Sequence, residues 1–264
     1  AFVFLRAMYL LSVDFRWSFA MYMLLGLYFR SYTTVRYYFV LALSLYSMVF
    51  LLRRAYGRFV LLILFAALFH KSVLLVLVVF PLALAPWNRW IRLALGVCAV
   101  LGTLLQRQVL EIALWFFPTF RNTVYLTQGV GVQANLPGIV RCLLVFALAF
   151  FCRRSGLWRQ RRECNLYLKL SVMGFLLYTC GSFLPLVSRL TYYLTTPQIL
   201  LVPALLERGY VGKKKKAVRI MTLLFCVGYF AWFLTAAWGS CIRVLPYRTW
   251  IFTDKEWING ADFF

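Results

Sequence analysis

Long apolar blocks constrain the fold of this chain more than any other feature of its sequence. Hydrophobic residues make up 64% of the 264 residues, whereas soluble domains contain roughly 45–50%. Several blocks approach the ~20 residues that a helix needs to cross a bilayer. The sequence therefore predicts an all-α, polytopic helical membrane protein with about 9–10 transmembrane or half-membrane helices. We expect residues 1–264 to form one integral membrane domain. The blocks lie near 1–13, 17–29, 36–52, 59–85, 91–105, 138–152, 167–187, 190–207 and 218–239.

Most of the charge lies between these blocks. The chain has 29 Lys and Arg against 7 Asp and Glu, a net charge of +22. The richest basic loops are 53–58, 153–162 and 208–219, and cytoplasmic loops carry such an excess of positive charge. This placement argues against nucleic acid as a partner and favours membrane lipids and an anionic, lipid-linked substrate. The run Lys213–Lys216 serves either as a topology signal or as a lipid-headgroup site. Glu163 and Glu207 are expected to pair with the basic loops.

The crossing count predicts a break at the only histidine. If 53–58 and 153–162 lie on the same side, an even number of crossings must separate them. Blocks 91–105 and 138–152 supply two, so block 59–85 must count as zero or two. We therefore expect two short helices that fold back at His70-Lys71-Ser72, facing the outside, as broken helices do where they line a cavity.

Residues 106–137 are expected to form an amphipathic helix and then an irregular loop on the outer side, where long loops often bind ligands. Arginines on that side need a reason, because outer loops are normally poor in them. One interpretation is a cavity that binds a diphosphate, since Arg forks contact phosphate oxygens in pairs. The alternative is snorkelling at the interface. The candidate cations are Arg36, His70, Lys71, Arg121, Arg189 and Arg248.

Tyrosines are the remaining candidates on the outer side. Tyr125, Tyr192 and Tyr193 either bind sugar or phosphate or belong to the aromatic belt at the interface. The scarcity of acids argues against a mechanism built on two carboxylates. It fits a reaction in which cations stabilise a departing diphosphate. One histidine and scattered cysteines make a poor ligand set, so we expect no metal and no cofactor.

Several segments together resemble the EpsG family of exopolysaccharide polymerases, relatives of the Wzy O-antigen polymerases. Arg36 opens a helix, a basic turn follows at Arg53-Arg54, and the next helix leads into the element Ala67-Leu68-Phe69-His70-Lys71-Ser72. Later, SRLTYYL at 188–194 and LPYR at 245–248 are similar to further family elements. The resemblance runs from about residue 30 to about 250 and departs at Tyr37, where Gln is expected. The family's first helices are expected to lie upstream of this chain.

The resemblance implies a membrane glycosyltransferase of the GT-C type in the bacterial cytoplasmic (inner) membrane, with its active site facing the outside. Such polymerases transfer a glycan from undecaprenyl diphosphate onto the next lipid-linked repeat unit. Arg36, Arg121 and Arg189 would then bind the diphosphate, and His70, Lys71 and Ser72 would lie near the acceptor hydroxyl or the second phosphate. A chain-length regulator and a flippase are possible partners. The alternatives are an O-antigen ligase-like transferase, a membrane acyltransferase, and a lipid-glycan flippase or other transporter.

Overall fold

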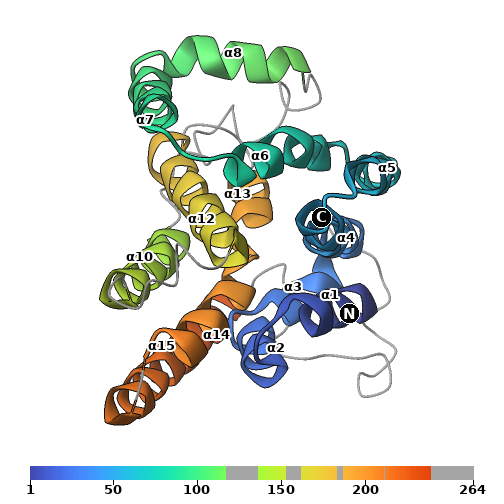
Figure 1. Ribbon diagram of the computed structural model, residues 1–264. Coiled ribbons are helices and arrows are strands. Elements are labelled where there is room, and N and C mark those ends of the chain that lie inside the picture. Colours follow the sequence, from blue (N-terminus) through green and yellow to red (C-terminus); the bar gives the residue numbers. More distant parts are fainter. Residues whose placement is uncertain (117–135, 153–161, 183–186, 211, 239–264) are drawn as a thin grey trace.

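The chain folds into a bundle of helices (Figure 1), seen in a computed structural model that describes residues 1–116, 136–152, 162–182, 187–210 and 212–238. No extended strand occurs in these described ranges. The fold is therefore all-α, as the apolar blocks predict. The α-helices are α1 (Phe2–Leu11), α2 (Phe15–Leu24), α3 (Leu27–Thr33), α4 (Val35–Leu52), α5 (Tyr56–Ala67), α6 (Leu75–Leu84), α7 (Arg89–Leu104), α8 (Gln106–Phe116), α10 (Leu136–Phe151), α12 (Arg162–Cys180), α13 (Val187–Thr195), α14 (Gln198–Arg208) and α15 (Gly212–Ala237), and η1 (Lys71–Leu74) is a 3₁₀ helix.

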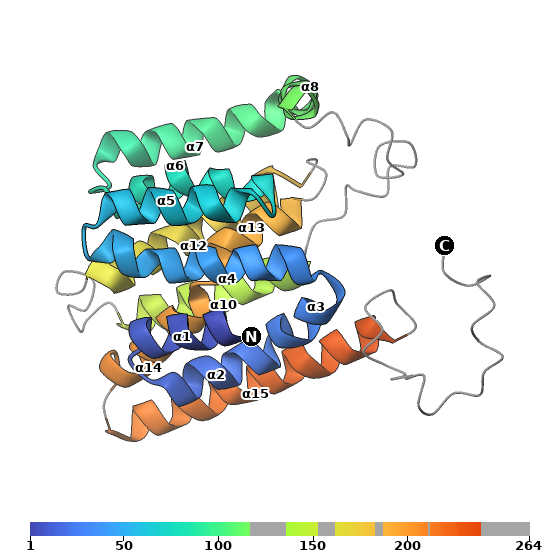
Figure 2. The ribbon, with the colours of Figure 1, turned by 90° about the vertical axis from the view of Figure 1, so that its right-hand side faces the viewer.

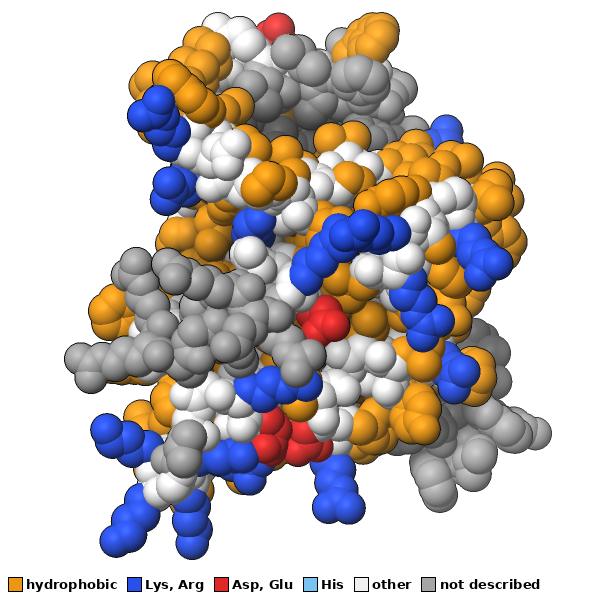
Figure 3. Space-filling view, viewed as in Figure 1, with side chains coloured by type: hydrophobic (Ala, Val, Ile, Leu, Met, Phe, Trp, Pro, Cys, Tyr) orange, Lys and Arg blue, Asp and Glu red, His pale blue; other side chains and the backbone are white. Residues whose placement is uncertain are grey.

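The connections that carry positive charge gather at one end of the bundle. In Figure 2 the α4–α5, α6–α7 and α14–α15 connections all lie at the left, which we call the basic end. Figure 3 looks onto this end and shows Lys and Arg side chains spread over it, with hydrophobic side chains around the rim. The α3–α4 turn and the α5–η1 break lie at the other end, which we call the far end. This distribution agrees with the crossing count made from the sequence.

Two helices pack in the centre of the bundle. α4 packs against α1 and α5, and α12 packs against α10, α13 and α6. Buried Ser44 and Ser47 donate hydrogen bonds to carbonyls of their own helix, at 2.8 and 2.6 Å. Their hydroxyls are therefore satisfied inside the apolar core, as buried polar groups must be.

Only α4 and α15 are, by length and composition, long and apolar enough to cross a membrane as single helices among the described residues. Three of the other apolar blocks, 17–29, 59–85 and 190–207, are each divided into shorter helices. Block 59–85 divides between Ala67 and Lys71, where extended His70 (φ −157°) precedes η1. The predicted break at His70 is therefore confirmed, and α5 and α6 run in opposite directions (Figure 2).

A second break, which the apolar pattern does not show, divides block 190–207. α13 ends at Thr195 and α14 begins at Gln198, after Pro197. Proline has no N–H to donate and fits the start of a helix better than its interior. The backbone N–H groups of Leu200 and Leu201 donate to the Pro197 carbonyl at 3.0 Å. Pro197 therefore starts a new helix inside what reads as one continuous apolar block.

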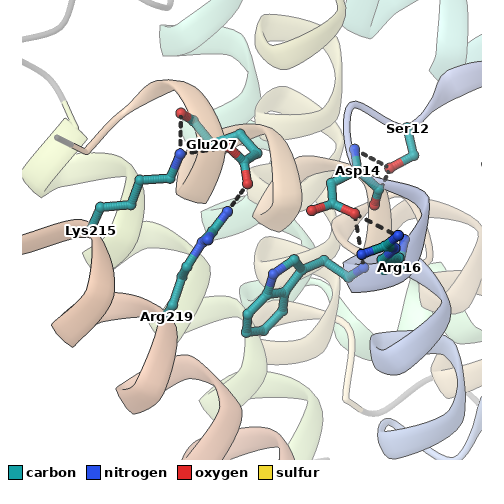
Figure 4. A network of polar contacts seen from close by, with 7 residues as sticks. Ser12, Asp14, Arg16, Glu207, Lys215 and Arg219 are labelled. Atoms are coloured by element: carbon teal, nitrogen blue, oxygen red, sulfur yellow. Dashed lines mark hydrogen bonds and ion pairs between the residues drawn. The ribbon is translucent and has the colours of Figure 1, made fainter. Parts of the chain in front are cut away.

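Acidic residues hold the basic end together (Figure 4). Glu207, at the end of α14, forms ion pairs with Lys215 (2.6 Å) and with Arg219 of α15. The predicted pairing of Glu207 is thus confirmed, while Glu163 forms no ion pair with any cation in the described part of the chain. Asp14 caps α2 by accepting the backbone N–H of Arg16 at 3.0 Å, the usual role of Asp before a helix.

Candidate functional site

A chain of hydrogen bonds links three polar side chains at the far end. The Ser72 hydroxyl lies 2.7 Å from Nδ1 of His70 and 3.0 Å from the hydroxyl of Tyr193. His70 ends the α5 segment, Ser72 belongs to η1, and Tyr193 belongs to α13. The break in block 59–85 therefore lets residues from one apolar segment reach a helix more than a hundred residues later. We call His70, Ser72, Tyr193, Tyr37 and Arg189 the far-end cluster.

Tyr37, which sequence reasoning set aside as a departure from the family pattern, lies at the centre of this cluster. Its ring contacts those of His70 and Tyr193, with centroids 5.5 and 5.7 Å apart. Its hydroxyl donates to the backbone carbonyl of Arg189 at 2.5 Å. Tyr37 is 4% exposed, so it joins α4 to the start of α13. No spacing rule in the sequence indicates this role, because it depends on how α4 is rotated about its axis.

The structure brings together part of the predicted cationic set. Arg189 is linked to His70 through Tyr37, whose ring contacts the His70 ring and whose hydroxyl donates to the Arg189 carbonyl. Arg36 and Lys71 are exposed at the far end, and neither forms an ion pair within the described ranges. Arg36 directly precedes Tyr37, and Lys71 lies between His70 and Ser72, so both exposed residues are neighbours of the far-end cluster in the chain.

Other predicted residues lie elsewhere. The Tyr192 side chain points in a different direction from that of Tyr193. Its hydroxyl accepts a hydrogen bond from Arg30 of α3. The sequence offers both Tyr192 and Tyr193 as candidates, and consecutive helical residues point about 100° apart. Arg121, Tyr125 and Arg248 lie outside the described residues.

The direction of the hydrogen-bond chain decides what His70 can do. If Ser72 donates to Nδ1, the other ring nitrogen, Nε2, carries the proton and is a donor. If Nδ1 donates to Ser72, Nε2 is free to accept a proton from a substrate hydroxyl. The second arrangement is the one that a general base requires. No group of His, Cys, Asp and Glu that could hold a metal occurs among the described residues.

An apolar cleft of about 310 Å³ lies beside this cluster. It is formed between α6, α7, α12 and α13, and its lining includes Leu75, directly after η1, and Leu194, directly after Tyr193. The cleft therefore shares α13 with the far-end cluster, and on α6 it begins directly after η1. This combination suits a ligand with a polar head and a long hydrocarbon chain.

The helices, the apolar surface and the polar cluster together define an all-α membrane protein with a candidate site at the end opposite its basic loops. Comparison with known sequences then gives the family. The sequence model of the EpsG family matches residues 1–249, and the chain belongs to that family. The match extends the resemblance that the motifs indicate from residue 30 back to residue 1. No curated protein and no solved structure matches the chain. The EpsG family is associated with exopolysaccharide polymerisation, a glycosyltransferase-like activity.

Proposed function

We propose that the chain polymerises undecaprenyl-diphosphate-linked oligosaccharide repeat units, as a multi-pass protein of the bacterial inner membrane. The far-end cluster carries this proposal, because its hydrogen bonds and ring contacts place His70, a candidate general base, and the cation Arg189 in one site. The basic end would face the cytoplasm by the positive-inside rule. The far-end cluster would then face the periplasm or exterior, where lipid-linked repeat units are joined.

The reaction needs one bond to form and one to break. The hydroxyl oxygen of the acceptor sugar attacks the anomeric carbon of the donor glycan, and the bond from that carbon to the diphosphate oxygen breaks. The bonding electrons leave with the undecaprenyl diphosphate, and the hydroxyl proton passes to Nε2 of His70. Arg189, Arg36 and Lys71 stabilise the negative charge that develops on the departing diphosphate.

The apolar cleft supports the same assignment. An undecaprenyl chain is a long hydrocarbon, and the cleft offers it an apolar lining next to Leu194. A diphosphate at the far-end cluster would then lie at the mouth of the cleft. Arg121, Tyr125, Tyr192 and Arg248 remain predicted contacts for phosphate or sugar.

A lipid-linked repeat-unit assay with the full chain in nanodiscs tests the proposal. We expect His70→Ala and Arg189→Ala to lose ladder formation while wild type makes a ladder of products. Lys213→Gln, at the basic end, is the matched control and should polymerise normally. Wild-type rates in both far-end variants would contradict the site, and a single transfer in place of a ladder would indicate the ligase-like alternative. Partners such as a chain-length regulator or flippase would alter the ladder length.

A further inference from the structure

Two arginines without carboxylate partners converge on one tyrosine inside the bundle. Arg141 of α10 is 2% exposed, and its guanidinium carbon lies 5.8 Å from the centre of the Tyr192 ring. Arg30 of α3 lies 5.9 Å from the same ring and donates a hydrogen bond to the Tyr192 hydroxyl. Neither guanidinium forms an ion pair in the described part of the chain.

Among the described residues, the other groups that contact these arginines are neutral. Arg141 donates to the Thr195 hydroxyl at 2.5 Å, and Arg30 lies over the Phe233 ring at 5.1 Å. The Nε atoms of both arginines are buried without a hydrogen-bond partner. Buried charges are normally paired, and buried donors are normally satisfied. Within the described part of the chain, the pair therefore has both uncompensated positive charge and unused donors.

Glycines let the aromatic walls of this region come close. A Cβ atom on Gly138, one turn before Arg141, would lie 2.5 Å from Cζ of Tyr178. Gly26, whose φ of +73° favours glycine, lies against the Phe233 ring, and a Cβ there would be 3.2 Å from it. Tyr178 and Phe233 are each almost fully buried. Close packing of these two aromatic walls holds the arginines beside them in position.

We propose that Arg30, Arg141 and the Tyr192 hydroxyl form an internal oxyanion site that binds a diphosphate group. Guanidinium groups bind phosphate oxygens in bidentate pairs, and the free Nε donors supply one half of each fork. This site differs from the far-end cluster, because Tyr192 faces it while Tyr193 faces Ser72. Resting on the proposed function, we assign its diphosphate to one of the two lipid-linked substrates that a polymerase must hold together.

Binding measured without turnover tests the site independently of polymerisation. The full chain in nanodiscs is titrated by calorimetry with inorganic diphosphate and, separately, with undecaprenyl diphosphate. The variants are Arg141→Met and Arg30→Met. Arg89→Met is the matched control, since Arg89 also lies over an aromatic ring, 5.3 Å from the centre of Trp90, but belongs to an exposed part of α7.

We expect each of the two buried variants to weaken binding about tenfold or more, the range for hydrogen bonds to charged groups, and Arg89→Met to bind like wild type. Arg-dependent binding of inorganic diphosphate identifies the anion alone as sufficient. Arg-dependent binding of only the lipid form identifies the lipid-linked substrate. Unchanged affinity for both probes in both variants would overturn the inference and leave the arginines as structural partners of Tyr192.

Two further results keep the test decisive. If Arg141→Met does not fold, Arg141→Lys keeps the charge and removes the fork, and diphosphate affinity should still fall several-fold. Wild-type affinity in folded Arg141→Lys and Arg30→Met together would overturn the site. If diphosphate binding depends on the two arginines but the protein makes no polymer, this site stands and the proposed function is refuted. If the protein polymerises but its diphosphate binding does not depend on the arginines, the proposed function stands and this site is refuted.

Discussion

Gly174 of α12 offers a measurable test of how tightly α13 is held. A Cβ atom at this position would lie 2.7 Å from Cγ2 of Thr195 and 3.3 Å from Cβ of Leu194. Thr195 cannot rotate its methyl group away freely, because its hydroxyl accepts from Arg141 and donates to the Thr191 carbonyl at 3.0 Å. Gly174→Ala must therefore push α13 outward or break these hydrogen bonds.

The expected size of the effect follows from a comparison with Gly228. Both glycines lie inside long helices, but a Cβ on Gly228 would meet nothing within 4 Å. Alanine gains up to about 1 kcal/mol over glycine in a helix at either position, so this gain cancels in the difference. Overpacking adds a cost of about 1–3 kcal/mol at Gly174 alone. Gly174→Ala should thus be less stable than Gly228→Ala by about 1–3 kcal/mol.

Thermal unfolding of the two variants in the same detergent measures this difference. Each kcal/mol should shift the unfolding midpoint by about 2–4 °C. Thr195→Ser removes the obstructing methyl group and keeps the hydroxyl. The double variant Gly174→Ala/Thr195→Ser should therefore recover stability relative to Gly174→Ala alone. Equal midpoints for Gly174→Ala and Gly228→Ala, or no recovery in the double variant, would refute the reasoning.

Three further substitutions probe the far-end cluster and the basic end. Ser72→Ala removes the hydrogen-bonded bridge between His70 and Tyr193. The polymerisation rate should fall about fivefold, which is equivalent to ~1 kcal/mol for one hydrogen bond. An unchanged rate in the repeat-unit assay would contradict a role for this bridge. Tyr37→Phe removes the hydrogen bond to the Arg189 carbonyl but keeps the ring contacts. Thermal unfolding should therefore show a loss of stability of about 1 kcal/mol. A rise in stability would contradict a stabilising role for this hydrogen bond. Glu207→Gln breaks the two partly exposed ion pairs with Lys215 and Arg219, so the free energy of unfolding should fall by less than about 1 kcal/mol. Polymerisation per folded molecule should not change. If high salt does not reduce the loss of stability, the ion pairs are not its cause.

Much of the fold can be predicted from the apolar blocks and the basic loops. Blocks 1–13, 36–52, 91–105 and 138–152 each correspond to one helix. The even number of crossings required by the basic loops predicts the break at His70. That argument works because hydropathy and loop charge are properties of sequence segments. The second break, at Pro197, is less visible because the residues on both sides of it are apolar. The signal for it is the proline itself, directly after Thr195-Thr196.

The candidate site could be predicted only in part. The sequence names His70, Ser72, Tyr193 and Arg189 as candidates, and hydrogen bonds and ring contacts link them in the structure. The separate directions of Tyr192 and Tyr193, and the central place of Tyr37, depend on helix rotation and packing, which one sequence does not reveal.

Arg141 had a usable signal. It lies inside the apolar block 138–152, and an ionisable residue in such a block is a functional candidate by default. The cations predicted for the outer side lie in loops and at helix starts, whereas Arg141 lies within an apolar block.

α13 connects the two polar regions of the bundle. Tyr193 faces the far-end cluster, and Tyr192 faces Arg30 and Arg141. Because these tyrosines are adjacent in one short helix, a shift of α13 moves both regions together. Gly174 and Thr195 hold that helix in contact with α12 and α10, and Tyr37 holds its start against α4. In the proposed polymerase, this one short helix would therefore set the distance between the two cationic sites.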